Sequence, residues 1–326
     1  MLVIATGADT NFFGNAQLQA HAFPMKSTVE ALQLRHRLLQ NFEDALVAKD
    51  ADPVLLRQLM QIVVVGGGPT GVEVSGALAE MRNHILPRDF PELDFTRMNI
   101  YLVEGSAKTL GAMSEKSSAQ SSAYLQQLGA KVITNTVVQD YDGKTATLSN
   151  GEAIETKMLI WAAGIRGNIP EGIDATLIAK GNRIRVDRTN KIVGTTNIYA
   201  VGDIAYMETP LYPQGHPQVA NVAIGHAENL ARNLLRQVKS KRQFLEYEYK
   251  DKGSMATVGK HLAVVDIPKP KIHFGGWLAW FVWMSLHLVL IVGVKNRLQI
   301  FINWVYKYFT YDQSLRLIFK GFDRMK

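Results

Sequence analysis

The chain has 326 residues, of which 47% are hydrophobic and 20% charged, so it is long enough for two domains with full cores and is not a disordered protein. It contains no cysteine, which excludes disulfides, thiolate-bound zinc or iron–sulfur sites and electron transfer through a cysteine pair. The formal net charge is +7, and the segment from Asp266 to Lys326 alone carries +6, from nine Lys or Arg against three Asp. A basic tail rich in Trp and Leu favours an anionic membrane surface over nucleic acid as the partner.

The first sixty residues predict a short strand and a long helix. An apolar run from Leu2 to Ala5 leads into the turn Thr6-Gly7. A helix is expected over about 28–49, because Ser27 and Glu30 fit a capping box at its start.

A glycine-rich turn between a buried strand (61–65) and a helix (70–86) is the most informative feature of the sequence. The turn reads Gly66-Gly67-Gly68-Pro69-Thr70-Gly71. Gly66 makes the tight turn, Gly68 lets the backbone approach a pyrophosphate, and Gly71 lets the helix close on the strand. The free N–H groups of the helix N-terminus favour phosphate charge, so the pattern predicts a dinucleotide site.

The elements that follow complete one nucleotide-binding domain over 59–170. We expect a strand over 99–103, a helix over 114–128 and a strand over 131–134. Short antiparallel strands are predicted around Asp142-Gly143 and Asn150-Gly151, and a buried strand over 158–162 ends in Ala163-Gly164. Alternation of parallel-type strands with helices is typical of a doubly wound α/β fold.

Glu104 closes the second strand of the βαβ unit. A carboxylate at this position accepts hydrogen bonds from a ribose 2′-OH and repels the additional phosphate of NADP, so the sequence favours NAD. The spacing from Gly71 is longer than usual, and an insertion at 87–93 absorbs the excess. The alternative is a solvated acid at a strand end.

The C-terminal half begins with a further strand that ends at Gly202-Asp203, where the aspartate can accept a hydrogen bond from a sugar-like hydroxyl. A helix is expected over about 218–239. From Phe274 to Val294, 21 residues contain no Lys, Arg, Asp or Glu. A more amphipathic stretch then covers 295–320.

The order of these strand–glycine endings resembles the two-dinucleotide-binding flavoprotein family, in which an NAD domain interrupts an FAD domain. The absence of cysteine rules against the members that react through thiols. Within the family, the chain is most similar to the type II NADH dehydrogenases. The segments that carry this resemblance are 86–90, 162–165, 252–259, 277–280 and 303–311.

The resemblance implies an α/β fold in which a Rossmann-like NAD domain is inserted in an incomplete FAD domain, followed by a C-terminal helical membrane anchor. The expected segments are a remnant of the FAD domain (1–58), the NAD(H) domain (59–170), the return segment of the FAD domain (171–265) and the membrane-anchoring helices (266–326). The family's opening FAD-binding unit is expected ahead of Leu2, so the chain looks like the C-terminal part of a longer protein.

The implied activity is non-proton-pumping NADH:quinone oxidoreduction through FAD, at the cytoplasmic face of a membrane, with a bacterial inner membrane expected. The implied partners are a quinone, membrane lipid and a second copy of the chain, with no nucleic acid and no metal. The residues expected to contact NAD are Gly66, Gly67, Gly68, Pro69, Thr70, Gly71, Glu104, Ala163 and Gly164. Those expected to contact FAD are Thr6, Gly7, Gly202, Asp203, Ala220, Asn221 and Val222.

Two groups of predicted site residues each have an alternative interpretation. Asn221, Gly225 and His226 stand where the family's quinone-side motif has glutamines, so quinone contact is expected there, while His226 also fits a polar helix residue without function. Glu73 is the candidate catalytic residue, contacting the nicotinamide side or relaying protons. Its alternative is an acid that complements the helix macrodipole.

The C-terminal segment and the predicted function also have alternative interpretations. Trp277, Trp280 and Trp283 crowd one end of the uncharged stretch, which favours a helix lying in the membrane plane over a single span or a buried helical pair. For the function, the alternatives are a truncated NAD-binding membrane module without catalysis, and a soluble flavin-dependent NADH reductase with a hydrophobic dimer interface.

Overall fold

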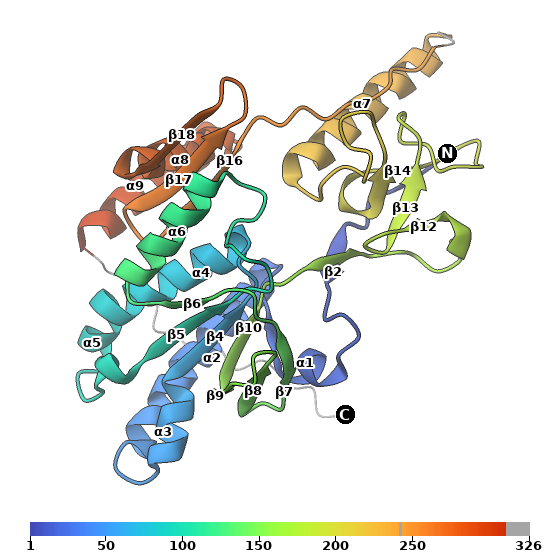
Figure 1. Ribbon diagram of the computed structural model, residues 1–326. Coiled ribbons are helices and arrows are strands. Elements are labelled where there is room, and N and C mark those ends of the chain that lie inside the picture. Colours follow the sequence, from blue (N-terminus) through green and yellow to red (C-terminus); the bar gives the residue numbers. More distant parts are fainter. Residues whose placement is uncertain (241–242, 311–326) are drawn as a thin grey trace. The chain divides into compact units, whose positions relative to one another are not determined.

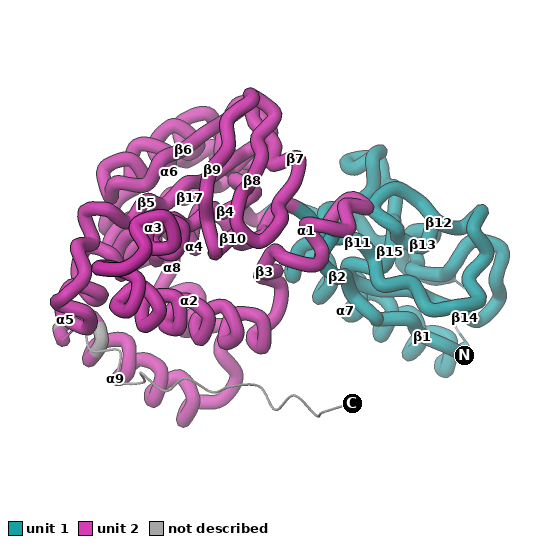
Figure 2. Tube along the Cα trace, turned by 90° about the horizontal axis from the view of Figure 1, so that it is seen from below, with its two compact units in different colours: residues 1–11, 164–251 teal, residues 12–163, 252–326 magenta. Residues whose placement is uncertain are grey.

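The computed structural model describes residues 1–240 and 243–310 (Figure 1). The chain forms two compact units, each built from two separate stretches of sequence (Figure 2). Of the described residues, unit 1 comprises 1–11, 164–240 and 243–251, and unit 2 comprises 12–163 and 252–310. These packing units divide the chain differently from the four segments expected from the sequence, because residues 12–58 and 252–276 pack with the NAD-type domain and residues 164–170 pack in unit 1.

Unit 2 is built on a parallel sheet in the order β3-β10-β4-β5-β6. Its strands are β3 (Phe23–Pro24), β10 (Met158–Trp161), β4 (Gln61–Val65), β5 (Asn99–Val103) and β6 (Lys131–Ile133). Its helices are α1 (Ala16–His21), α2 (Thr28–Ala48), α3 (Pro53–Leu59), α4 (Pro69–Glu80), α5 (Leu86–Asp89) and α6 (Glu115–Gln127), with a π-helical turn over Met81–Ile85 and a 3-10 turn over Phe95–Arg97.

The central strand β4 is buried on both faces, which explains its continuous apolar sequence. Ile62 and Val64 pack into a core formed with the helices, and Val63 and Val65 pack into a second core on the other face. That second core is covered by an antiparallel meander of β7 (Val138–Tyr141), β8 (Thr145–Leu148) and β9 (Ala153–Glu155). The predicted strands, helices and meander of this region are therefore present, and the capping box of Ser27 and Glu30 starts α2.

The C-terminal part of unit 2 contains an antiparallel sheet that the sequence reading did not predict. Its strands are β16 (Ser254–Val258), β17 (Leu262–Ile267) and β18 (Ile272–Gly276), followed by α8 (Trp277–Leu290) and α9 (Val294–Thr310). Ala256 and Val258 enter the same core as Leu78 and Ala79 of α4. This sheet therefore belongs to the packing of the NAD-type domain.

Unit 1 contains three small sheets and one long helix. β1 (Leu2–Ile4) pairs in parallel with β14 (Ile198–Ala200), and β2 (Ala8–Thr10) pairs antiparallel with β11 (Ile165–Gly167). The third sheet has the order β12-β13-β15, over Ile178–Ala179, Arg183–Val186 and Ala205–Met207. 3-10 turns cover Ala175–Leu177 and Gly202–Ile204, and the helix is α7 (Ala220–Val238).

The predicted C-terminal anchor is only partly matched by the structure. No helix in residues 1–240 and 243–310 is both long and apolar enough to cross a membrane. Most side chains of α8 and α9 are exposed or half-buried, and Ala279 is the buried residue of α8, so these two helices do not form a buried pair. The predicted stretch from 311 to 320, including Tyr311, lies outside the described residues.

Candidate functional site

The glycine-rich turn of unit 2 has the geometry that its sequence predicts. Gly66 adopts φ +105°, a left-handed conformation that favours glycine. A Cβ atom at Gly66 would lie 2.6 Å from the carbonyl oxygen of Ala162, and one at Gly71 would lie 1.8 Å from the carbonyl oxygen of Gly66. The missing side chains therefore let α4 begin directly above the ends of β4 and β10.

The N-terminus of α4 is open on the side where a phosphate would bind. Gly68 is the N-cap, no side chain caps it within the described chain, and a Cβ there would meet nothing within 4 Å. Pro69 is at the first helical position, where the missing N–H costs nothing. The backbone N–H groups of Thr70 and Gly71 are in the first turn, whose donors have no partner within the helix. This arrangement suits a pyrophosphate.

Glu104 follows the end of β5 and reaches back to the glycine-rich turn. One carboxylate oxygen accepts a hydrogen bond from the backbone N–H of Gly67, and the other accepts one from Ser106 N–H at 2.6 Å. A Cβ at Gly67 would lie 2.9 Å from Cγ of Glu104. The middle glycine thus gives room for this carboxylate, whose remaining lone pairs are in position for a ribose hydroxyl.

Ala163 and Gly164 fall into different units. Ala163 follows β10 in unit 2, and its Cα would lie 2.7 Å from a Cβ at Gly66. Gly164 belongs to unit 1, where its carbonyl oxygen accepts a hydrogen bond from Asn11 N–H at 3.0 Å. The structure places Ala163 beside the glycine-rich turn.

Glu73 lies on α4 and is bonded to the unpredicted C-terminal sheet. Its Oε1 accepts hydrogen bonds from the backbone N–H of Thr257 at 3.2 Å and from the Thr257 hydroxyl at 3.4 Å. Burial raises the pKa of Glu73, while the bonds from Thr257 and the charge of His287 lower it. Because α4 has no acid in its first turn, macrodipole compensation does not account for Glu73. No local pattern in the sequence marks Thr257 as the partner of Glu73.

The raised pKa of Glu73 predicts how Glu73→Gln changes stability. The folded state disfavours the carboxylate, so Glu73 costs stability as the pH rises from 4.5 through its folded pKa. Glutamine keeps the acceptor for Thr257 without the charge. In denaturant unfolding the variant should be at least as stable as the wild type at pH 7, and this difference should shrink at pH 4. Glu73→Ala, which removes both the charge and the acceptor, is the control and should be less stable than Glu73→Gln at both pH values. A Gln variant that loses stability at pH 7 but not at pH 4 would contradict this account.

In unit 1, two predicted FAD segments follow neighbouring parallel strands. β1 leads to Thr6-Gly7 and β14 leads to Gly202-Asp203, so both segments lie at the same edge of the two-stranded sheet. Gly7 and Gly202 adopt φ +68° and +75°, and a Cβ at Gly7 would meet nothing within 4 Å. The Thr6 hydroxyl donates to the carbonyl oxygen of Asn168 at 2.6 Å. This edge has the glycine turns that a flavin nucleotide needs for close approach.

The start of α7 lies beside the Gly202 turn. A Cβ at Gly202 would lie 3.4 Å from Cβ of Ala223. Val222 is buried, and Ala220 and Asn221 are exposed in the first turn. The Asn221 side chain hydrogen-bonds the Tyr249 hydroxyl. α7 has no side-chain cap within the described chain. The N–H groups of Val219 and Val222 donate to the carbonyl oxygens of Pro217 and Val219, which leaves those of Ala220 and Asn221 for an anion.

Two residues expected to contact quinone have packing roles in the structure. Gly225 lies under the ring of Tyr247, whose hydroxyl would be 1.9 Å from a Cβ at that position. His226 is fully buried, and both of its ring nitrogens are engaged, by Gly202 N–H at 3.3 Å and by His216 at 3.1 Å. This geometry does not favour quinone contact at His226, and His216 is a partner that sequence reasoning missed.

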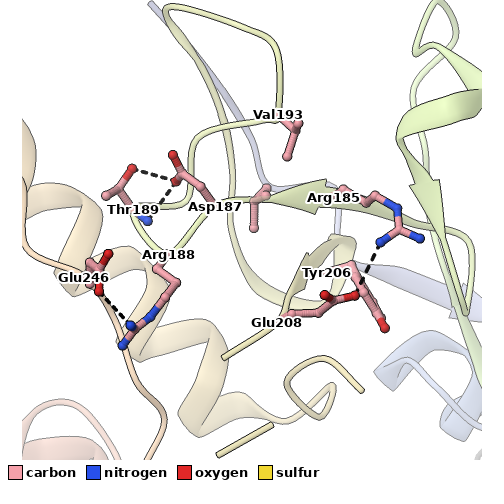
Figure 3. Close-up of a pocket in the computed structure, with 9 residues that line it drawn as sticks. Arg185, Asp187, Arg188, Thr189, Val193, Tyr206, Glu208 and Glu246 are labelled. Atoms are coloured by element: carbon pink, nitrogen blue, oxygen red, sulfur yellow. Dashed lines mark hydrogen bonds and ion pairs between the residues drawn. The ribbon is translucent and has the colours of Figure 1, made fainter. Parts of the chain in front are cut away.

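A pocket of about 400 Å³ opens elsewhere in unit 1 (Figure 3). Four of its charged side chains form ion pairs: Arg188 with Glu246 at 2.6 Å and Arg185 with Glu208 at 3.4 Å. The carboxylate of Asp187 accepts hydrogen bonds from Thr189. None of the residues predicted for cofactor binding lines it. The lining residues are Arg185, Val186, Asp187, Arg188, Thr189, Val193, Tyr206, Glu208 and Glu246.

Comparison with known proteins places this arrangement in a family. The sequence model of the pyridine nucleotide-disulphide oxidoreductases matches residues 1–227, and that of the NDH2 C-terminal domain matches residues 252–311. A type II NADH:quinone oxidoreductase of Mycobacterium tuberculosis, Ndh, is 32% identical over 317 residues, covering 93% of this chain and 65% of that protein. An internal alternative NAD(P)H-ubiquinone oxidoreductase of Solanum tuberosum is 28% identical, covering 93% of this chain and 63% of that protein.

A solved structure has the same fold. NDH2 from Plasmodium falciparum in complex with NADH superposes with a TM-score of 0.84 at 22% identity, covering 98% of this chain and 79% of that one. The chain spans about 65% of the length of the curated relatives that it matches. Because the first family model covers more than half of its residues, the chain belongs to the pyridine nucleotide-disulphide oxidoreductase family, and its resemblance to the type II NADH dehydrogenases within that family is confirmed.

Proposed function

We propose that this chain carries out NADH:quinone oxidoreduction with FAD, without proton pumping, at a membrane surface. The observation that carries the proposal is the open glycine-rich turn of unit 2 with Glu104 bonded to it, in a chain whose relatives are named NADH:quinone oxidoreductases. The glycine turns at the β1 and β14 strand ends of unit 1 fit a second nucleotide. When bound, the flavin supplies the hydride acceptor and passes two electrons to the quinone.

In this proposal each group of residues has a separate task. Gly66 to Gly71 and the first turn of α4 bind the NADH pyrophosphate, and Glu104 selects the ribose without a 2′-phosphate, with Ala163 and Gly164 completing the NAD contacts. FAD is bound by Thr6, Gly7, Gly202, Asp203, Ala220, Asn221 and Val222. Glu73 carries or orients a proton on the nicotinamide side, since its carboxyl is buried and its pKa raised. Asn221, which is exposed at the start of α7, remains the proposed contact for quinone, because Gly225 and His226 are packed against Tyr247.

Initial-rate kinetics test the reaction. NADH oxidation by the detergent-purified chain, with a water-soluble quinone as acceptor, should give parallel double-reciprocal lines when both substrates are varied, because in a ping-pong reaction NAD⁺ is released before the quinone binds. A folded sample that binds NADH and FAD but transfers no electrons to any quinone would overturn the proposal and favour an NAD-binding module.

Removing the charge of Glu104 should relax the choice of nucleotide. In Glu104→Gln the amide oxygen still accepts from Gly67, while the repulsion of a 2′-phosphate is lost. We expect the ratio of kcat/KM for NADH to that for NADPH to fall about tenfold, which corresponds to about 1.4 kcal/mol. Glu115→Gln, which discharges a neighbouring exposed acid paired with Lys108, is the matched control and should leave the ratio unchanged. Equal changes in the two variants would argue against Glu104 as the selecting residue.

We propose that α8 and α9 attach the protein to the membrane by lying in the plane of its surface. Two ring contacts, Trp280 with Tyr308 and Trp283 with Trp304, join the helices, and large apolar side chains remain exposed on both. Lys295 and Arg297 at the start of α9 suit anionic headgroups, which favours the cytoplasmic leaflet. The exposed apolar residues of α8 and α9 include Trp277, Leu278, Phe281, Val289, Leu290, Val294, Leu298, Phe301, Ile302 and Val305.

That the protein forms a homodimer remains a prediction.

Charges placed on the apolar face of α9 should detach the protein from membranes. Phe301→Glu with Val305→Glu replaces two apolar side chains that are 42% and 40% exposed with negative charges. The variant loses apolar burial and is repelled by anionic lipid, so binding to vesicles of phosphatidylglycerol and phosphatidylethanolamine should fall more than about tenfold in sedimentation. Gln299→Glu with Asn303→Glu adds the same charge to the opposite face and should bind nearly as well as the wild type. A wild-type protein that stays out of the vesicle fraction would contradict the anchor and favour a soluble reductase.

A further inference from the structure

Four side chains in unit 1 form a continuous hydrogen-bond chain that begins at the backbone of Gly202. Gly202 N–H donates to Nδ1 of His226 at 3.3 Å, and Nε2 of His226 lies 3.1 Å from Nδ1 of His216. Nε2 of His216 lies 3.2 Å from Oγ1 of Thr209, and this hydroxyl donates to Oε1 of Glu248 at 2.5 Å. These hydrogen bonds therefore link the Gly202 turn to Glu248, which lies in the segment after α7.

The donor at one end of this hydrogen-bond chain and the acceptor at the other end determine the direction of every hydrogen bond in it. A backbone N–H can only donate and a carboxylate can only accept. Nδ1 of His226 therefore carries no proton, and its Nε2–H donates to His216. In the same way, Nδ1 of His216 accepts and its Nε2–H donates to Thr209, whose single hydroxyl proton goes to Glu248. Both imidazoles are thus assigned the neutral Nε2–H tautomer.

The surroundings of the two histidines favour this neutral state. His226 is 0% and His216 1% exposed, and the edge-on ring of Tyr247 packs against both. Burial lowers the pKa of His226 to about 3 and that of His216 to about 4, with the nearby positive charge of Arg183 acting in the same direction. The charged and titratable groups around the pair are Arg183, Arg188, Asp203, Tyr212, Glu246, Tyr247, Glu248 and Tyr249.

Glu248, the last residue of the hydrogen-bond chain, lies in a segment that makes further contacts with unit 1. Arg188 lies 3.5 Å from Oε2 of Glu248, and its Nε donates to the carbonyl oxygen of Tyr247 at 3.4 Å. The backbone N–H of Tyr247 donates in return to the carbonyl oxygen of Arg188 at 2.8 Å. The Asn233 side chain donates to and accepts from the backbone of Leu245. The segment that carries Glu248 is therefore fixed to α7 and to the loop after β13.

We propose that His226 and His216 are positioning residues that hold the Gly202–Asp203 turn for the flavin through this one-way hydrogen-bond chain. The inference rests on the proposed function, which assigns Gly202 and Asp203 to the FAD site. Gly202 has φ +75°, a left-handed conformation that favours glycine, and its N–H donates to Nδ1 of His226. His226 supplies that acceptor, so the direction of the turn is set before any nucleotide binds.

The tautomers are tested directly by ¹⁵N NMR of the full chain labelled at histidine. We expect both buried histidines to show the Nε2–H neutral form at pH 7 and to keep it at pH 5. Assignment follows from the loss of one set of signals in His226→Asn and in His216→Asn. An Nδ1–H tautomer or a charged imidazolium at either residue would overturn the proposal without reference to FAD.

A matched pair of substitutions tests the positioning. In His226→Asn, Oδ1 can take the place of Nδ1 as the acceptor for Gly202, while His226→Leu offers no acceptor. Loss of one such bond is worth about tenfold. The Leu variant should therefore lower the hydrogen-exchange protection of the Gly202 amide and the affinity for FAD by about that factor, and the Asn variant should keep both within about threefold.

The outcomes separate this inference from the proposed function. Equal effects of Asn and Leu on Gly202 exchange, or no effect of either, would overturn the positioning role. A wild-type chain with the predicted tautomers and exchange that binds no FAD would instead overturn the flavin site, and the positioning of Gly202 by His226 would stand.

Discussion

Replacing Gly71 with alanine should abolish NADH binding and destabilise unit 2. A Cβ at this position would lie 1.8 Å from the carbonyl oxygen of Gly66, a backbone atom that cannot rotate away as a side chain would. α4 must then move off the end of β4, and its first-turn N–H groups move away from the pyrophosphate position. Overpacking of this kind costs on the order of 1–3 kcal/mol or more in folding stability. Titration calorimetry with NADH and denaturant unfolding measure the two effects.

Gly68→Ala is the matched control for this prediction. Gly68 has φ −69°, and a Cβ there would meet nothing within 4 Å, so the fold should lose at most about 1 kcal/mol, the cost of alanine at an N-cap. A methyl group in this open space would stand where the pyrophosphate approaches, and NADH binding should therefore weaken while unfolding changes little. A Gly71→Ala variant that binds NADH like the wild type would show that the turn is not the nucleotide site.

The second large effect is a loss of stability on mild acidification. Burial lowers the pKa of His226 to about 3 and that of His216 to about 4, against 6.5 for the free side chain. Between these values the unfolded chain binds protons that the folded chain does not, so stability is intact above pH 6.5 and falls as the pH decreases. Each histidine contributes up to about 1.4 kcal/mol per pH unit, and the pair should cost about 2 kcal/mol between pH 6 and 5.

Substitutions isolate this contribution from other titrating groups. The double variant His216→Asn, His226→Asn should show a shallower pH dependence of the unfolding midpoint of unit 1 over pH 4–6.5. His261→Asn, in unit 2, is the control: its pKa is also lowered by burial, but the change should not affect unit 1. An unfolding midpoint that is flat from pH 6.5 to 4 in the wild type would contradict the buried neutral pair.

The parts of the fold that the sequence predicts are those set by local chemistry. The glycines of the nucleotide turn are required by backbone clashes within a few residues, and the capping box of α2 is a contact between Ser27 and Glu30. Both features can therefore be predicted from the spacing of residues along the sequence. The alternation of Val63 with Val64 between two cores also follows from strand geometry, once the strand is recognised.

The parts that the sequence does not predict depend on contacts between distant segments. Thr257 meets Glu73 across 184 positions, and no local pattern marks either as a partner. The sheet of β16–β18 is short and includes Gly275 and Gly276, which weaken a strand pattern. Its burial comes from packing against α4, α6 and α8. His226 resembles an ordinary polar helix residue until His216 is placed beside it.

Anaerobic mixing of NADH with the FAD-loaded, detergent-purified chain tests the central claim most directly. The account predicts rapid loss of the oxidised-flavin absorbance on mixing and its return when a quinone is added. The Gly71→Ala variant, loaded with FAD, should show neither change, because its flavin site in unit 1 is intact and its nucleotide turn is not. An oxidised-flavin spectrum that stays unchanged at saturating NADH in the wild type would contradict hydride transfer between the two sites.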